Sequence, residues 1–242
     1  MFSRCRAFPG LFAIKMRNCA LSMSMRTVLL VLLRLHIASM TSTLQRVGGI
    51  ALHEGNQLAT TNCILTTDST GQRIWDAGRV LASVLCHSDL NGKRVLELGS
   101  GTGVGGLTAA KGGAALVMLT DGSETAVELL QQNIEANDLE DRAQSYQLSW
   151  GWSYLADTVD LVAHGPWDLI IGSDLLYAPE SHPDLLTTLA ALCTPSHTEV
   201  LLTYPTRFTE SLFFDEAAEL FRIDDHEEVE PALWATRMVM RA

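Results

Sequence analysis

Apolar and polar positions follow two different spacings from residue 70 to the C-terminus. Residues 70–85 have apolar side chains at helical spacing, and Asn91-Gly92 then turns the chain. Short apolar runs, typical of strands, lie at 94–98, 116–120, 143–149, 167–173 and 199–204. Helical patterns between and after them lie at 104–112, 123–137, 183–192 and 209–221. This alternation predicts an α/β fold with a mostly parallel sheet and helices on both faces, closed by an antiparallel hairpin from 227–229 and 233–240.

The first part of the chain has a different pattern. Residues 41–67 are rich in β-branched side chains, and their apolar and polar positions alternate between glycine turns. This pattern predicts a small N-terminal β meander. Residues 1–40 are basic, and their apolar run at 27–33 is too short for a bilayer, which needs about 20 residues. This extension is interpreted as a transit peptide, as a disordered segment, or as a secretion signal or anchor. The predicted organisation is a basic extension at 1–40 and a domain at 41–242.

Charge and cysteine usage narrow the range of functions. The formal net charge is −11, although residues 1–46 carry seven basic and no acidic side chains. The acidic remainder predicts a basic protein partner and no nucleic acid. Five cysteines without a C-x-x-C pair favour a reducing compartment, and the scattered histidines predict no metal site. We therefore expect a cytoplasmic protein, or a mitochondrial or plastid one if the extension is a transit peptide, with no stable membrane span.

A glycine-rich turn carries the strongest chemical signal. Residues 95–106 read Val-Leu-Glu-Leu-Gly-Ser-Gly-Thr-Gly-Val-Gly-Gly, and such glycines let backbone N–H groups approach a ligand closely. Glu97 lies two residues before the first glycine, where its charge would oppose a pyrophosphate and suit a cationic, amino-acid-like ligand. Asp121 ends the next strand, where it can accept both ribose hydroxyls of NAD or S-adenosylmethionine. The alternative is a structural turn with an exposed Glu97.

Four motifs in this order resemble those of the class I, seven-strand S-adenosylmethionine-dependent methyltransferases, and among them methyltransferase family 16. They are G-x-x-x-W-x-A at 71–77, the glycine turn at 95–105, L-x-W-G at 148–151 and D-x-x-Y at 174–177. The resemblance covers about residues 45–242. It implies a Rossmann-like sheet of seven strands, S-adenosyl-L-methionine as the cofactor, and methylation of protein lysine. The first forty residues match nothing in the family domain.

The resemblance also implies which residues bind the cofactor. They would be Trp75, Glu97, Gly99, Ser100, Gly101, Gly103, Asp121, Trp150 and Ser173, with no metal. Glu97 would support the amino-acid end of the cofactor, Asp121 its ribose and Trp150 its adenine. The alternative role for the two tryptophans is packing in the core.

Asp174 and Tyr177 are the predicted catalytic residues. The sulfonium of the cofactor is already a good leaving group, so the enzyme needs only to position the acceptor. Asp174 would capture and orient the acceptor nitrogen, with proton loss to water, and Tyr177 would wall the amine channel. Asp174 as a helix N-cap is the alternative. We expect a monomeric protein-lysine methyltransferase. Alternatively, the methyl acceptor is another protein side chain, such as arginine or histidine, or a small molecule. A further hypothesis is a cofactor-binding module without catalysis.

Overall fold

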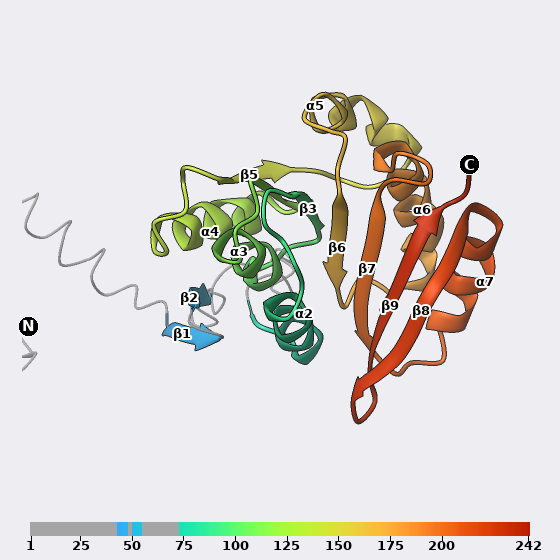
Figure 1. The fold of residues 1–242 in the computed structure, drawn as a ribbon, viewed down its shortest axis with the longest axis horizontal. Helices are drawn as coiled ribbons and strands as arrows, with labels where there is room; N and C mark the ends of the chain where they lie inside the picture. The colour runs from blue at the N-terminus through green and yellow to red at the C-terminus, as the bar shows by residue number, and fades with distance from the viewer. Residues whose placement is uncertain (1–42, 48–49, 55–72) are drawn as a thin grey trace, which may run out of the picture. The chain divides into compact units, whose positions relative to one another are not determined.

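The computed structural model describes residues 43–47, 50–54 and 73–242 (Figure 1). The extension predicted at 1–40, part of the meander and the start of the G-x-x-x-W-x-A motif lie outside these residues. The described residues all belong to one compact unit, Ser42–Ala242, which we call the second unit. In the second unit, β1 (Thr43–Val47) and β2 (Ile50–Glu54) form an antiparallel hairpin.

A seven-stranded sheet is the centre of the second unit. Its strand order is β5-β4-β3-β6-β7-β9-β8. The strands are β3 (Arg94–Leu98), β4 (Leu116–Asp121), β5 (Ala143–Gln147), β6 (Leu169–Ser173), β7 (Glu199–Pro205), β8 (Phe221–Glu230) and β9 (Leu233–Met240). β3 to β7 pair in parallel, β9 is antiparallel to β7, and β8 is antiparallel to β9. The predicted seven-strand, mostly parallel sheet and its closing hairpin are confirmed.

The chain order places a ligand-binding position in this sheet. From β3 the chain proceeds through β4 to β5 at one edge, and then returns to β6 on the other side of β3. β3 and β6 are therefore neighbours whose connections run in opposite directions. Ligands of open α/β sheets bind beyond the carboxyl ends of the strands at such a switch point.

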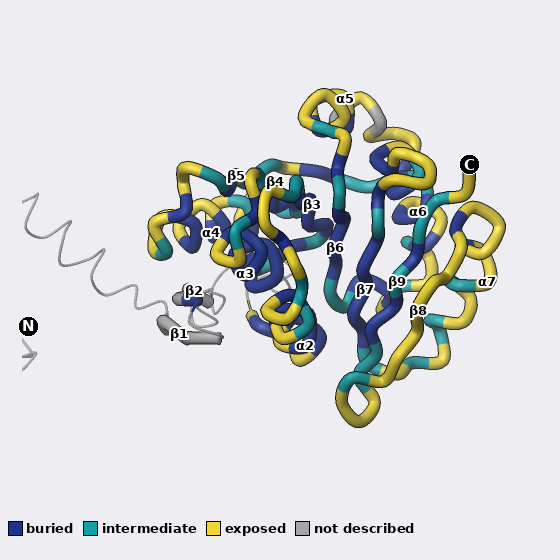
Figure 2. The backbone as a smooth tube through the Cα atoms, in the orientation of Figure 1, coloured by how far each residue is buried: buried dark blue, intermediate teal, exposed yellow. Residues whose placement is uncertain are grey.

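Helices cover both faces of the sheet because successive strand side chains point to opposite faces. Val95 packs in one core cluster with the first group of helices, whereas Leu96 and Leu98 pack in the other with the second group. The first group is α2 (Asp76–Cys86), α3 (Val104–Lys111) and α4 (Glu124–Glu135), and the second is α5 (Thr158–Ala163), α6 (His182–Leu192) and α7 (Glu210–Leu220). Figure 2 shows β3, β6 and β7 as mostly buried and β8 as exposed along most of its length.

Two local features differ from the sequence pattern. Ser123 occupies the N-cap position of α4, but its hydroxyl pairs with Thr125 and makes no capping bond to the helix. A 3-10 helix, η3 (Trp152–Asp157), leads directly into α5 in a segment for which the pattern predicted no element. Across the described ranges, no helix is both long and apolar enough to cross a membrane.

Candidate cofactor and acceptor site

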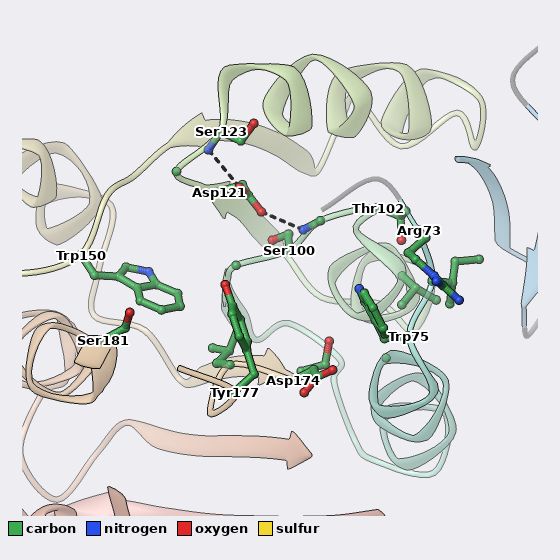
Figure 3. A pocket seen from close by; sticks show the side chains of 18 of the residues that line it. Arg73, Trp75, Ser100, Thr102, Asp121, Ser123, Trp150, Asp174, Tyr177 and Ser181 are labelled. Atoms are coloured by element: carbon green, nitrogen blue, oxygen red, sulfur yellow. Dashed lines mark hydrogen bonds between the residues drawn. The ribbon is translucent and has the colours of Figure 1, made fainter. Parts of the chain in front are cut away.

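The loop that joins β3 to α3 lies at the switch point and is tied to the end of β4. Ser100 N–H donates to the Thr120 carbonyl at 2.8 Å, and Gly101 N–H donates to Asp121 Oδ2 at 3.1 Å. Asp121 Oδ1 also accepts the N–H of Ser123 at 3.0 Å (Figure 3). A carboxylate can accept about four hydrogen bonds, so Asp121 can hold the loop and accept ligand hydroxyls as well.

A cavity of about 510 Å³ opens beside this loop. Its size is within the range of small-molecule sites, about 300–1,000 Å³. Figure 3 shows Trp75 and Trp150 on opposite sides of it, with Asp121 and Tyr177 between them. The predicted site residues that line it are Trp75, Gly99, Ser100, Gly101, Asp121, Trp150, Ser173, Asp174 and Tyr177. The structure therefore brings together most of the predicted cofactor residues and both predicted catalytic residues.

Glu97 and Gly103 are not part of this lining. Only 1% of Glu97 is exposed, and its Oε2 accepts the N–H of Gly106, in the first turn of α3, at 3.0 Å. Burial raises the pKa of Glu97 to about 7, although the hydrogen bonds from Gly106 and Ser100 oppose this rise. A Cβ on Gly105 would overlap Oε1 of Glu97, so the glycine leaves room for the carboxylate. Gly103 is the N-cap residue of α3.

The position of Glu97 shows a structural role for this residue. The carboxylate lies on the inner side of the loop and accepts a backbone N–H that the start of a helix leaves unpaired. Glu97 therefore holds the loop and α3 in place, and its role at the amino-acid end of the cofactor stays a prediction.

The two tryptophans are available to a ligand. Trp75 is 39% exposed, and the guanidinium carbon of Arg73 lies 4.5 Å from the centre of its ring. Trp150 is half-buried: it packs against the core and also lines the cavity. A Cβ on Gly99 would lie 3.3 Å from the Trp150 ring, so glycine at this position lets the loop approach the indole closely. Packing alone therefore does not account for either side chain.

Asp174 directly follows β6 and has a left-handed backbone, with φ at 57°. Its N–H donates to the Thr203 carbonyl at 2.8 Å. Both carboxylate oxygens accept from Arg207, Oδ1 from Nη1 and Oδ2 from Nη2, the latter at 3.2 Å. The next helical segment, η4, begins only at Pro179, so the N-cap alternative for Asp174 is excluded. Tyr177 lies in the intervening turn and is 57% exposed.

Arg207 is the functional candidate that the sequence analysis missed. It follows β7, so it lies at the same carboxyl edge of the sheet as Asp174. Its place after a predicted parallel strand was the signal that could have identified it. Thr102 and Ser181 also line the cavity without having been predicted. Within the part of the chain that the structure describes, no three His, Cys, Asp or Glu side chains gather as a metal site would require.

The residues of the cavity fit S-adenosylmethionine. The backbone of Gly99 and Gly101 borders the cavity, Asp121 offers a carboxylate to hydroxyl donors, and Trp150 offers an aromatic face to a base. Aromatic side chains and a few well-placed polar groups are typical of a cofactor pocket. The fit rests on Asp121, Trp150 and the loop, all of which border the cavity.

Sequence similarity to known proteins also indicates a protein methyltransferase. A family model described as lysine methyltransferase matches residues 55–220. Protein N-lysine methyltransferase METTL21A of Danio rerio is 39% identical over 158 residues, which are 63% of this chain and 69% of that protein. EEF1A lysine methyltransferase 3 of Mus musculus is 36% identical over 148 residues, 60% of each chain. Histone-arginine methyltransferase METTL23 of Homo sapiens is 37% identical over 123 residues, 48% of this chain and 60% of that protein.

Solved structures share the fold. A methyltransferase crystallised with S-adenosylhomocysteine, SMU.776, has a TM-score of 0.58 at 18% identity over 81% of this chain and 55% of that chain. The ribosomal protein L11 methylase of Lactobacillus delbrueckii has a TM-score of 0.53 at 24% identity, over 67% of this chain and 77% of that one.

The match of the family model covers more than half of the chain, and the sheet order and cavity agree with it. The predicted family, cofactor and reaction class are thereby confirmed. The chain belongs to the lysine methyltransferase family, the enzymes that use S-adenosylmethionine to methylate lysine in proteins.

Proposed function

We propose that the cavity binds S-adenosylmethionine against residues 99–101, and that a lysine side chain of a protein substrate enters it past Asp174 and Tyr177. The observation that carries this proposal is the shared cavity: residues suited to the cofactor and the D-x-x-Y residues line the same space. Asp174 lies at the carboxyl end of β6, next to the loop that follows β3. An acceptor held by Asp174 would therefore be close to a ligand held by the loop.

The proposed roles follow from what each residue can do. S-adenosylmethionine supplies a methyl group bound to a sulfonium, and the sulfur is a good leaving group because it departs as a neutral thioether. Asp121 would hold the ribose hydroxyls, and Trp150 would stack on the base. Asp174 would accept a hydrogen bond from the lysine amine and orient its lone pair at about 3 Å from the methyl carbon. A lysine amine has a pKa of about 10.4, so it must first lose a proton, which we assign to water.

The substrate that we propose is a basic protein, and the enzyme is proposed to act as a monomer. The formal net charge of −11 favours encounter with a basic surface. The edge strand β8 carries exposed acids at positions 224, 225, 227, 228 and 230. Charged edge strands discourage pairing with a second copy, which supports a monomer. Light scattering of the purified chain tests this state, and a stable dimer would contradict it.

We propose the cytoplasm as the location. Cys86 and Cys193, the free thiols among the described residues, suit a reducing compartment. Mitochondria or plastids remain the alternative if residues 1–40 direct import. Fluorescent fusions with and without residues 1–40 distinguish these locations, because only an import signal would change location on removal.

The proposed reaction is tested by incubating a cell lysate with the enzyme and S-adenosylmethionine carrying an isotopically labelled methyl group. Mass spectrometry should find the label on lysine, and the Asp174→Asn variant should leave far less of it. Label on arginine would favour the alternative acceptor, which the similarity to a histone-arginine methyltransferase keeps in view. Intact cofactor binding without any labelled protein would indicate a non-catalytic module.

A further inference from the structure

The acceptor side of the cavity contains an ion pair, formed by Asp174 and Arg207. The guanidinium contacts both carboxylate oxygens, in the two-pronged geometry that makes such pairs strong. The Asp174 side chain is 12% exposed and that of Arg207 is 32% exposed. Both residues line the cavity, so the pair lies in its wall, where an acceptor would enter.

The backbone holds both partners in place. Arg207 N–H donates to Glu210 Oε2, at the start of α7, at 3.0 Å. Asp174 N–H donates to the Thr203 carbonyl of β7, the strand that precedes Arg207. The backbone on each side of the ion pair is therefore fixed by a hydrogen bond. These bonds hold Asp174 and Arg207 within reach of one another.

A carboxylate alone would be a poor neighbour for the acceptor. A nearby negative charge stabilises a lysine in its ammonium form, which has no lone pair to accept a methyl group. A guanidinium keeps its positive charge at all ordinary pH values, and so offsets the charge of the carboxylate. A carboxylate can accept about four hydrogen bonds, so the bonds from Arg207 leave acceptor positions for an amine.

We propose that Arg207 is a positioning residue that neutralises Asp174, so that the acceptor amine can bind this carboxylate without being held as ammonium. This inference rests on the proposed function, because it takes Asp174 as the residue that orients the acceptor. Arg207 acts through Asp174 and need not touch the methyl group. Removing its charge should therefore change the pH at which the amine becomes reactive.

Other charged groups around the pair do not replace Arg207. Arg73 and Asp121 line the same cavity, but Arg73 lies over the ring of Trp75 and Asp121 is bound to the loop after β3. Glu210 accepts a hydrogen bond from the backbone N–H of Arg207. Among the described ion pairs, Asp174 is paired with Arg207.

The test is the pH profile of methyl transfer to the protein that the wild-type enzyme labels in the lysate. In Arg207→Gln the profile should shift upward by about one pH unit, which means an approximately tenfold lower rate at pH 7.5. The rate should recover at higher pH, where a larger fraction of the acceptor amine is unprotonated. Arg207→Lys keeps a positive charge and should keep the wild-type profile at a lower rate.

Arg237→Gln is the matched control. Arg237 pairs with Glu199 at the other end of β7, and its side chain is 30% exposed, close to the 32% of Arg207. It lies outside the cavity lining and should leave the profile unchanged. In an Asp174→Asn background, Arg207→Gln should no longer shift the profile, because a residue that acts through Asp174 loses its effect when the carboxylate is absent.

Three results would overturn the inference: the same profile for Arg207→Gln and wild type, a uniform loss of rate at all pH values, or an equal shift in Arg237→Gln. Calorimetry should give the same affinity for S-adenosylhomocysteine in all variants. This result would show that the variants are folded. A wild-type enzyme that labels no lysine, or an Asp174→Asn variant with full turnover, would instead refute the proposed function.

Discussion

Replacing Glu97 by glutamine should make the stability of the fold less dependent on pH. Only 1% of the residue is exposed, and burial raises the pKa of its carboxyl from 4.5 to about 7. The folded state therefore holds the proton more tightly than the unfolded chain does. The stabilising contribution of Glu97 is complete below about pH 4.5 and is lost as the pH rises through about 7.

The size of the effect follows from the two pKa values. Each pKa unit corresponds to about 1.36 kcal/mol, so the difference between 4.5 and about 7 gives a loss of about 3 kcal/mol. Domains of this kind are stable by only about 5–15 kcal/mol, so the change should be easy to measure. Glutamine does not titrate, and its amide oxygen can still accept the N–H of Gly106.

Urea unfolding at pH 5 and pH 8 measures this effect. Between these pH values, which span most of this range, the wild type should lose about 2.5 kcal/mol more free energy of unfolding than Glu97→Gln does. Asp141→Asn is the control, because Asp141 is an exposed acid whose pKa is lowered by its hydrogen bond with Arg142. Asp141→Asn should keep the loss of unfolding free energy that the wild type shows between pH 5 and pH 8. Parallel pH dependence in the wild type and Glu97→Gln would refute the reasoning, since it would mean that Glu97 titrates as a solvated carboxyl.

Three further predictions concern the site and the extension. Gly101→Val should abolish binding of S-adenosylmethionine in calorimetry, because φ at this residue is 53° and a β-branched side chain resists that conformation; tighter binding of NAD than of S-adenosylmethionine would contradict the cofactor assignment. Asp174→Asn should keep the left-handed backbone and the cofactor affinity but lower turnover by about 10² or more, about 2.7 kcal/mol, and near-normal turnover would remove Asp174 from the mechanism. Deleting residues 1–40 should preserve methyl transfer in vitro, because the motifs all lie within Ser42–Ala242, and a loss of cofactor binding would show that the extension belongs to the domain.

The sequence pattern predicted the sheet well because buried parallel strands are short apolar runs bounded by turns. The strands at 94–98 and 233–240 have the predicted bounds, and most others differ by one or two residues at an end. β8 begins at Phe221, six residues before the predicted start at 227. The strand at 167–173 begins only at Leu169, and the side chain of the preceding Asp168 binds the neighbouring strand: its Oδ2 accepts the N–H of Arg94 at 2.8 Å. Contacts of this kind join residues far apart in the chain and leave no periodic signal.

The direction of Glu97 could have been inferred, but its environment could not. Side chains alternate along a strand, so a residue between Leu96 and Leu98 must point to the opposite face from both. Those two leucines pack in the cluster of α5, α6 and α7, which places Glu97 on the face that α3 covers. The motif identified an acid beside the glycine turn, whereas the strand geometry directs that acid toward the first turn of α3.

The pairing of Asp174 with Arg207 shows what a motif omits. The two residues are 33 positions apart, and nothing in the pattern joins them. They meet because β6 and β7 are neighbouring parallel strands, with Ser173 opposite Thr203, so the residues after both strands reach the same edge. The D-x-x-Y motif specifies the carboxylate, while the strand beside it determines which charge that carboxylate faces. Because an amine and its ammonium form differ in reactivity, the proposed role of Asp174 makes the acceptor chemistry depend on both strands.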